Sequence, residues 1–288
     1  MDLGVTIFLT DRSIGPVELA REVEERGFAS LWLPEHTPHP HQPPHPAPMG
    51  EPIAEEYLRC LDPFVAMGMI AAVTERLRVG TGIALMAERD PIVTAKEVAT
   101  LDHCSGGRVS LGVGYGWNIE ELEKKGEKRR TTAAPSHPSG RRAGAGPRHA
   151  GPLGRGSAPR STASTSLSES WAWPKPVQQV RGRAGVPVRG GGAPGPLLFR
   201  HIAEYADGWI PGGGAGVAAA MADLRAAADE AGRDPAELQV IPFGTLPDPG
   251  KLEHYASLGI RETVLRLPSA DRDEVLRTLD AFAPFLAA

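Results

Sequence analysis

Short apolar runs alternate with amphipathic helical segments along most of the chain, and this alternation restricts the fold more than any other feature of the sequence. The first unit has a β-prone run at 5–9, a helical pattern from Pro16 to Gly27 and a second apolar run at 30–34. Proline near the start of a helix and glycine just past its end are typical boundary residues. A strand–helix–strand unit of this kind is the building block of parallel sheets.

The same unit recurs to the end of the chain. The expected strands are 5–9, 30–34, 77–85, 108–114, 186–188, 208–210, 238–243 and 262–267. The expected helices are 16–27, 62–76, 91–101, 197–206, 217–231, 251–258 and 273–286. Strict alternation favours a parallel sheet, and eight strands favour a closed (β/α)8 (TIM) barrel of α/β class. A Rossmann-like open sheet is the alternative, but no glycine fingerprint follows the first strand. The length of 288 residues suits one barrel domain spanning 1–288.

Two segments interrupt this alternation. The first, 36–48, is rich in proline and histidine and follows the second expected strand. Loops at that position lie on the catalytic face of a barrel. The histidines that could bind a metal there are His36, His39, His41 and His45. Because proline-rich loops seldom preorganise metal ligands, we expect a solvated lid and no metal.

The second interruption, 128–168, contains no Asp or Glu, and its only large apolar residues are Leu153 and Leu167. A segment of this composition cannot bury enough apolar surface to order itself. It nevertheless stands where a barrel requires its fourth helix. We therefore expect an irregular segment at about 128–168 in place of helix four.

Five motifs carry the chemistry-bearing residues. They are 31–36 (LWLPEH), 78–83 (RVGTGI), 105–118 (SGGRVSLGVGYGWN), 170–176 (SWAWPKP) and 199–209 (FRHIAEYADGW). In this order they resemble the luciferase-like monooxygenase superfamily, especially its actinobacterial branch that uses the deazaflavin coenzyme F420. The likeness covers 1–127 and about 169–288. It implies a bacterial-luciferase-like barrel that uses F420 or FMN on an organic substrate, and such proteins are often homodimers.

Relatives in that superfamily have an ordinary amphipathic helix where 128–168 stands. One hypothesis is that this segment is translated from a shifted reading frame. Codon degeneracy permits Gly140 to Gly156, read one nucleotide later, to encode VAERERVLAMRALWAE, which has the pattern of an amphipathic helix. A genuine disordered insertion is the alternative. If helix four is missing, the product is expected to be destabilised or inactive.

Glu35 and His36 end the second expected strand, and barrel enzymes carry out their chemistry at such strand ends. A histidine beside a carboxylate can donate or accept a proton near neutral pH. By resemblance to deazaflavin dehydrogenases, His36 is the candidate base that takes the substrate proton, and Glu35 is its neighbour or a cofactor contact. The alternative is that His36 only begins the loop rich in histidine and proline.

The ends of the third and fourth strands offer cofactor contacts. Thr81 and Gly82 end the third strand, where a glycine allows close approach of the backbone to a flat ring. The resemblance implies a cis non-proline peptide there. After the fourth strand, aromatic faces and an amide could bind a flavin-type ring or its ribityl chain. The candidates in that loop are Gly114, Tyr115, Trp117 and Asn118. Both groups have a purely structural alternative, as a tight strand end or an ordered loop.

Two glycine runs follow the fifth and sixth strands, and each precedes a helix. Bare backbone N–H groups at a helix N-terminus suit a phosphate. The candidate residues are Gly190, Gly191, Gly192, Gly212 and Gly213. Neither run is a Walker or Rossmann fingerprint, so each could be a flexible turn.

These observations together predict an oxidoreductase that transfers hydride between F420 and a small organic substrate. An FMN-dependent monooxygenase is the first alternative, and an inactive product of a shifted frame is the second. A metal-dependent barrel hydrolase is disfavoured because only the second strand end offers histidine. A net charge of −4 gives no reason to expect nucleic acid or a membrane as partner. Without a signal peptide or a membrane-length apolar run, and with two cysteines lacking metal-like spacing, a cytoplasmic protein is expected.

Overall fold

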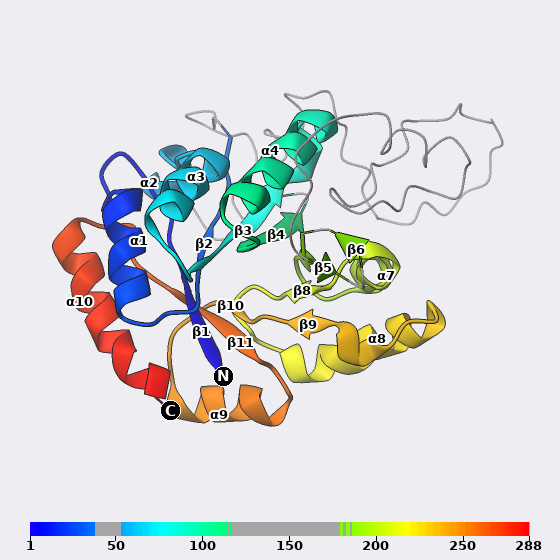
Figure 1. Ribbon diagram of the computed structural model, residues 1–288. Coiled ribbons are helices and arrows are strands. Elements are labelled where there is room, and N and C mark those ends of the chain that lie inside the picture. The colour runs from blue at the N-terminus through cyan, green and yellow to red at the C-terminus, as the bar shows by residue number, and fades with distance from the viewer. Residues whose placement is uncertain (38–52, 115, 117–178, 181–182, 185, 288) are drawn as a thin grey trace.

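The strands form one twisted parallel sheet with helices around it (Figure 1). The computed structural model describes residues 1–37, 53–114, 116, 179–180, 183–184 and 186–287. The expected irregular segment at 128–168 and most of the loop at 36–48 lie outside these ranges. Within the described ranges, no helix combines the length and the apolar character needed to cross a bilayer.

Nine strands make up the main sheet, and all neighbouring strands run parallel. In chain order they are β1 Asp2–Thr6, β2 Ser30–Leu33, β3 Arg78–Leu85, β4 Val109–Gly114, β7 Val188–Gly191, β8 Gly208–Ile210, β9 Gln239–Val240, β10 Phe243–Thr245 and β11 Glu262–Arg266. Their order in the sheet is β10-β11-β1-β2-β3-β4-β7-β8-β9. A separate antiparallel pair is formed by β5 (Gln179–Val180) and β6 (Arg183–Ala184).

The sheet closes because its two outermost strands are consecutive parts of one segment, 239–245. β9 pairs with β8, whereas β10 pairs with β11. Pro242 stands between them, and a proline has no N–H group to donate to a ladder. Its carbonyl still accepts from the Val264 amide at 2.9 Å, while the Ile241 amide donates to the Trp209 carbonyl at 2.9 Å. With β9 and β10 counted as one broken strand, the predicted eight-stranded barrel is confirmed.

The expected helices all form, and the bounds follow their capping residues. They are α1 Pro16–Glu25, α3 Pro63–Val73, α4 Pro91–Cys104, α7 Pro196–Tyr205, α8 Val217–Glu230, α9 Pro249–Ser257 and α10 Arg272–Phe282. Asp62, Asp90 and Asp248 each accept a backbone N–H from the first turn of α3, α4 and α9, and each precedes a proline. In Figure 1, α10, α1, α3 and α4 follow one another around the outside of the strands.

Several short elements were not predicted. They are the four-residue helix α2 (Glu55–Leu58) and the 3-10 turns η1 (Met86–Glu88), η2 (Pro235–Glu237) and η3 (Ala283–Ala287). One turn of helix leaves too few residues for a periodic pattern, so sequence reasoning does not detect such elements. Two of them, α2 and η1, lie near the carboxyl ends of β1 to β3 and so bear on the site.

Two strand boundaries in the prediction were wrong. The first strand is Asp2–Thr6, not 5–9, because its ladder begins where the Asp2 amide donates to the Arg261 carbonyl at 2.8 Å. The fifth is Val188–Gly191, not 186–188. Gly190 and Gly191 are therefore strand residues and not a loop before a helix.

Their absent side chains leave room for neighbours. A Cβ on Gly190 would lie 2.8 Å from a side-chain carbon of Ile202 in α7, and one on Gly191 would lie 2.4 Å from Ile83. Glycine at these two strand positions therefore serves close packing on both faces of β7.

The interior of the barrel divides into two layers. Towards the carboxyl ends of the strands it is apolar, with Trp32, Ile210, Ile241 and Val264 buried together and Phe243 packed on them. Towards the amino ends it is polar, and the buried residues there include Ser30, Ser110, Arg189 and Glu262. The main core, between the strands and the surrounding helices, is built mostly from aliphatic side chains, with aromatic residues such as Phe199 and Trp209 among them. The apolar layer therefore forms the floor beneath the carboxyl-end opening.

Candidate functional site

Glu35 follows β2 and is buried, with 6% of its surface exposed. Its Oε1 accepts hydrogen bonds from Arg89, with the Arg89 Nε at 2.7 Å and Nη2 at 2.6 Å. Its Oε2 accepts from the Leu85 amide at 2.7 Å. These contacts tie the end of β2 to the end of β3. The carboxylate that we expected beside the His36 ring is thus used to join two strand ends.

Arg89 connects this carboxylate to two surrounding helices. Its Nη2 lies 2.8 Å from Asp62 at the start of α3, and its Nη1 lies 3.4 Å from Glu97 in α4. The guanidinium carbon also lies 4.3 Å from the centre of the Phe64 ring. Burial alone would lower the pKa of Arg89, but the contacts with Glu35 and Asp62 raise it. The Arg89 guanidinium is therefore a permanent cation that joins Glu35 to the two helices.

His36 is half-buried in a cluster of three rings. Its ring centre lies 4.8 Å from that of Tyr57 in an edge-on arrangement and 6.0 Å from that of Phe8 in a stacked one. Phe8 and Tyr57 contact each other as well, at 4.6 Å. Burial raises the pKa of Tyr57 above its ordinary value of 10.0, so the phenol stays protonated at neutral pH. The imidazole is thus held between two aromatic rings next to the end of β2.

Thr81 and Gly82 lie inside β3 and not at its end as predicted, close to the point where the pairing of β3 with β4 shifts register between Thr81 and Ala84. The Thr81 hydroxyl is fully buried and donates to the Gly112 carbonyl of β4 at 2.8 Å, so it points away from any ligand. The following Gly82–Ile83 peptide bond is cis, as the resemblance implies. A Cβ on Gly82 would lie 2.1 Å from the Phe243 ring, so no larger residue fits there without moving that ring. Of the two predicted residues, Gly82 is the one that the structure brings to the opening.

Glycines surround the Ile83 side chain. A Cβ on Gly114 would lie 2.0 Å from the Ile83 Cδ1, and one on Gly191 would lie 2.4 Å from its Cγ2. The Ile83 side chain thus occupies the notches that the missing side chains of Gly114 and Gly191 leave. The result is a low apolar floor with the Gly82–Ile83 backbone at its surface. A planar, weakly polar ring suits such a floor.

Several amides of the two glycine runs are hydrogen-bonded, although Gly192, Gly212 and Gly213 are exposed. The Gly192 amide donates to the Ile210 carbonyl at 3.4 Å, and the Gly192 carbonyl accepts from the Trp209 indole at 3.1 Å. Gly212 and Gly213 do lie in the loop between β8 and α8, but the Gly213 amide donates to the Phe243 carbonyl at 2.8 Å. Most of these N–H groups are therefore already paired within the barrel.

Three predicted cofactor residues, Tyr115, Trp117 and Asn118, lie outside the described residues, as do His39, His41 and His45. In the described part of the chain, no group of three or more His, Cys, Asp or Glu side chains is arranged to hold a metal ion.

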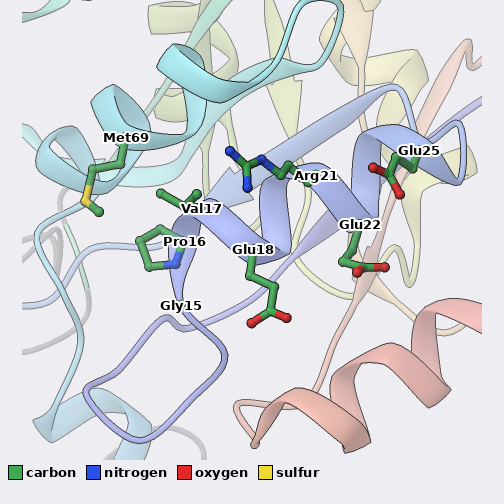
Figure 2. A pocket seen from close by; sticks show the side chains of 8 residues that line it. All are labelled: Gly15, Pro16, Val17, Glu18, Arg21, Glu22, Glu25 and Met69. Atoms are coloured by element: carbon green, nitrogen blue, oxygen red, sulfur yellow. The ribbon is translucent and has the colours of Figure 1, made fainter.

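Two hollows open away from these strand ends. One, of about 530 Å³, is lined by α1 residues from Gly15 to Glu25 and by Met69 of α3 (Figure 2). The other, of about 750 Å³, lies at the amino-end mouth and is lined by Asp2, Arg78 and Glu262, among others. Neither contains a residue of the predicted site. Because barrel chemistry is located at the carboxyl ends of strands, we take the group of residues around Gly82 and His36 as the candidate site.

Sequence reasoning missed two residues of this site, Arg89 and Tyr57. Arg89 comes directly before the Asp90–Pro91 helix start, so its position resembled an ordinary helix boundary. Tyr57 belongs to the four-residue helix α2, which has no detectable period. Neither residue carried a signal that local pattern could have revealed.

A closed parallel barrel with helices around it is the architecture of a (β/α)8 protein. Comparison with known proteins shows which kind. The sequence profile of the luciferase-like monooxygenase family matches residues 15–139. An uncharacterised protein of Mycobacterium tuberculosis is 36% identical over 302 aligned residues, which cover 100% of this chain and 99% of that protein. The chain belongs to the luciferase-like monooxygenase family, whose members are oxidoreductases.

Solved structures show the same fold. The monooxygenase RslO1 from Streptomyces bottropensis has a TM-score of 0.63 at 16% sequence identity, and the match covers 100% of this chain and 99% of RslO1. The coenzyme F420-dependent tetrahydromethanopterin reductase from Methanopyrus kandleri has a TM-score of 0.59 at 17% identity, covering 98% of this chain and 97% of the reductase. At these identities the likeness is one of fold.

Proposed function

We propose that this protein is an F420-dependent oxidoreductase that transfers hydride between the cofactor and a small organic substrate. The observation that carries the proposal is the surface around Ile83, where the Ile83 side chain fills the space left by Gly114 and Gly191 and the Phe243 ring fills the space left by Gly82. This surface suits the flat ring of a deazaflavin. The F420-dependent reductase of similar fold supports the choice of cofactor, and the monooxygenase of similar fold supports FMN as the alternative.

In this proposal, different residues of the chain would bind the cofactor and transfer the substrate proton. The bound deazaflavin would accept or deliver the hydride. The backbone at Gly82 and Ile83 would support one face of its ring, and the loop at Gly212 and Gly213 would lie towards its phosphate-bearing tail. A ring nitrogen of His36 would take the hydroxyl proton when a substrate alcohol is oxidised, or return one in the reverse direction. Glu35, held by Arg89, would fix the strand end that carries His36.

Titration of the purified protein with F420 and with FMN, followed by cofactor fluorescence, tests this proposal. We expect F420 to bind and FMN to bind more weakly. Preferential binding of FMN would instead favour an FMN-dependent monooxygenase. If neither F420 nor FMN binds, the proposal is contradicted. A screen of small alcohols and carbonyl compounds, read as loss or gain of oxidised cofactor, would then identify the substrate. His36→Gln should keep cofactor binding and lose turnover by about 100-fold or more, whereas the exposed His103→Gln should change neither.

We also propose a homodimer formed through α3. This helix has no charged or polar side chain, and its outer residues Val65 and Met69 are 68% and 44% exposed. On the neighbouring start of α4, Ile92 and Val93 are 64% and 55% exposed. An apolar surface shared by two adjacent helices favours burial against a second copy. Sedimentation should give a dimer for the parent protein and a monomer for Val65→Glu, while Leu246→Glu, at an equally exposed residue elsewhere, should remain dimeric.

We also propose a cellular compartment and a domain organisation for this protein. Cys60 and Cys104 form no disulfide in the described part of the chain, and we propose a reducing cytoplasm as the compartment. We propose further that 1–288 is a single domain, with 128–168 as an interruption within it. Limited proteolysis tests the single-domain proposal, because the two fragments produced by cleavage within 128–168 should remain associated.

A further inference from the structure

The helix α2 (Glu55–Leu58) has little stability of its own. It is four residues long, and its N-cap residue Ala54 forms no side-chain hydrogen bond. Isolated helices of this length do not persist in water. Its position must therefore come from contacts with the rest of the barrel.

Ion pairs fix α2 over the carboxyl ends of β1 and β11. The three pairs are Arg12–Glu55, Arg59–Asp11 and Arg266–Glu56, the last with a separation of 2.8 Å. The partners come from the loop after β1 and from the end of β11, so α2 is gripped from two sides. The six side chains are between 21% and 63% exposed. Pairs this exposed are individually weak and are screened by salt.

Immediately after α2 the chain is anchored through its backbone. Cys60 forms an isolated antiparallel bridge with Thr10, and the Leu61 amide donates to the Leu9 carbonyl at 2.8 Å. This anchor does not depend on the ion pairs. The chain is therefore anchored through its backbone at the C-terminal end of α2, while Glu55 and Glu56 of the helix itself form exposed ion pairs.

The arm carries one buried side chain, Tyr57, which is 8% exposed. Tyr57 contacts the ring of His36 edge-on and the ring of Phe8 at an angle. The ion pairs on α2 and the aromatic contact below it are thus parts of one small element. A movement of α2 that separates Arg266 from Glu56 also withdraws Tyr57 from His36.

We propose that α2 is a latch on the candidate site, in which the three ion pairs hold Tyr57 against His36 and their loss uncovers the His36 ring. Tyr57 is then a positioning residue, because it fixes the imidazole and does not exchange protons with the substrate. With the latch closed, His36 is kept between two rings in one orientation. With the latch open, the imidazole is accessible to solvent and to incoming reagents.

The catalytic meaning of the latch rests on the proposed function, because that function assigns the substrate proton to His36. The latch itself can be tested without substrate or cofactor. Diethyl pyrocarbonate acylates a histidine ring nitrogen, and fragmentation of the labelled peptide in the mass spectrometer reports the rate at His36 separately from His39, His41 and His45, which lie in the same tryptic peptide. Labelling of the unliganded protein therefore measures how well α2 covers this ring.

A charge swap provides the sharpest test. Glu56→Arg places like charges opposite Arg266 and should raise the labelling rate of His36 by about two- to fivefold, which is the effect of losing one exposed pair. The double variant Glu56→Arg/Arg266→Glu restores an opposite pair and should return the rate to that of the parent. Glu18→Arg is the matched control, because it breaks the similarly exposed Glu18–Arg272 pair between α1 and α10.

Variants of Tyr57 test the contact itself. Tyr57→Leu should accelerate labelling with the ion pairs intact, and Tyr57→Phe should not, because it keeps the ring. Thermal unfolding of each variant confirms that it is folded. Unchanged labelling in both Glu56→Arg and Tyr57→Leu, or failure of the double swap to restore protection, would overturn the latch. If the parent protein does not bind F420, the proposed function is contradicted, but the labelling result still tests the latch.

Discussion

Glu35 and Arg89 depend on each other because both are buried, with 6% and 14% of their side chains exposed. Removing either partner leaves an uncompensated charge inside the protein, which typically costs about 3–5 kcal/mol. Removing both charges leaves no buried charge uncompensated, because Asp62 and Glu97, which also lose Arg89 as partner, are exposed to solvent. The pair therefore orders the strand ends below His36 more than it adds to the total free energy of unfolding.

We predict that Arg89→Met lowers the free energy of unfolding by about 3 kcal/mol and that Glu35→Gln/Arg89→Met recovers most of that loss. Urea unfolding of the parent, the two single variants and the double variant gives the complete cycle. Arg272→Met, which removes a half-exposed surface arginine, is the control and should change stability by less than about 1 kcal/mol. Additive single effects would show that the two charges are not coupled.

Two glycines differ sharply in what surrounds them. A Cβ on Gly112 in β4 would lie 2.2 Å from the Thr81 carbonyl oxygen, which belongs to the backbone and cannot turn aside. A Cβ on Gly68 in α3 would meet nothing within 4 Å. The first glycine is required by the close approach of β3 and β4, whereas the second is not.

We therefore expect Gly112→Ala to destabilise the barrel by roughly 1–3 kcal/mol or to prevent its folding. Gly68→Ala should stabilise it by about 0.5–1 kcal/mol, because alanine is the better residue within a helix. Thermal unfolding of the two variants beside the parent measures both effects. Equal effects of the two substitutions would mean that the strand contact does not limit the side chain at 112.

At the level of elements, Glu24 of α1 holds the loop that leads into β3. Its Oε1 accepts from the amides of Arg76 and Leu77 at 2.7 and 2.8 Å, and the Glu75 amide donates to the same carboxylate. Burial raises the pKa of Glu24, but these three donors outweigh it, so the pKa lies below its ordinary value of 4.5. A carboxylate with a lowered pKa stabilises the folded state only while it is ionised.

The sign of the pH effect follows from that lowered pKa. Above pH 4.5 the contribution of Glu24 is fully present, and it is lost as the pH falls through the folded-state pKa. Glu24→Gln should thus be less stable than the parent at pH 7, and the difference should shrink towards pH 3. Denaturant midpoints measured across this range test it. Glu25→Gln, at an exposed residue of the same helix, should show no such convergence.

The elements that sequence pattern predicted well are those with a repeated period and a marked boundary. The helices starting at Pro16, Pro63 and Pro91 were found because proline and the preceding residue define their first turns. The fifth strand was misplaced because Val186 and Val188 look more strand-like than Gly190 and Gly191, although the ladder uses the glycines. Tertiary packing against Ile83 and Ile202, which is invisible locally, decided that register.

The same reasoning explains which parts of the candidate site were anticipated. His36 follows the end of β2 closely, so the barrel hypothesis itself identified it, whereas Gly82 lies within β3 beside a shift in its register with β4. Arg89 reaches Glu35 across 54 positions of the chain, and Tyr57 reaches His36 through a one-turn helix. Such contacts depend on the three-dimensional path of the chain, and no spacing rule encodes them.

For the whole molecule, the reading-frame hypothesis makes its own prediction. Sequencing the gene across the codons for 140–156 should reveal that the frame one nucleotide later encodes an amphipathic helix. A protein made with that frame restored should unfold at a higher temperature and bind F420 more tightly than the present chain, because a barrel requires its fourth helix to cover strand four. A shifted frame interrupted by stop codons, with peptide masses that match 128–168 as written, would make this segment a true insertion.

Because β1 pairs with β11, the barrel cannot close until the last strand has been translated. Asp2 lies beside Glu262 in the finished barrel, so one edge of the first strand waits for a partner translated 260 positions later. At about 5–20 residues per second, a ribosome needs roughly 10 to 50 seconds to supply it. Throughout that interval the nascent chain carries an open, aggregation-prone strand edge. Holdase chaperones, rather than speed of folding, would then govern how much of this protein a cell recovers.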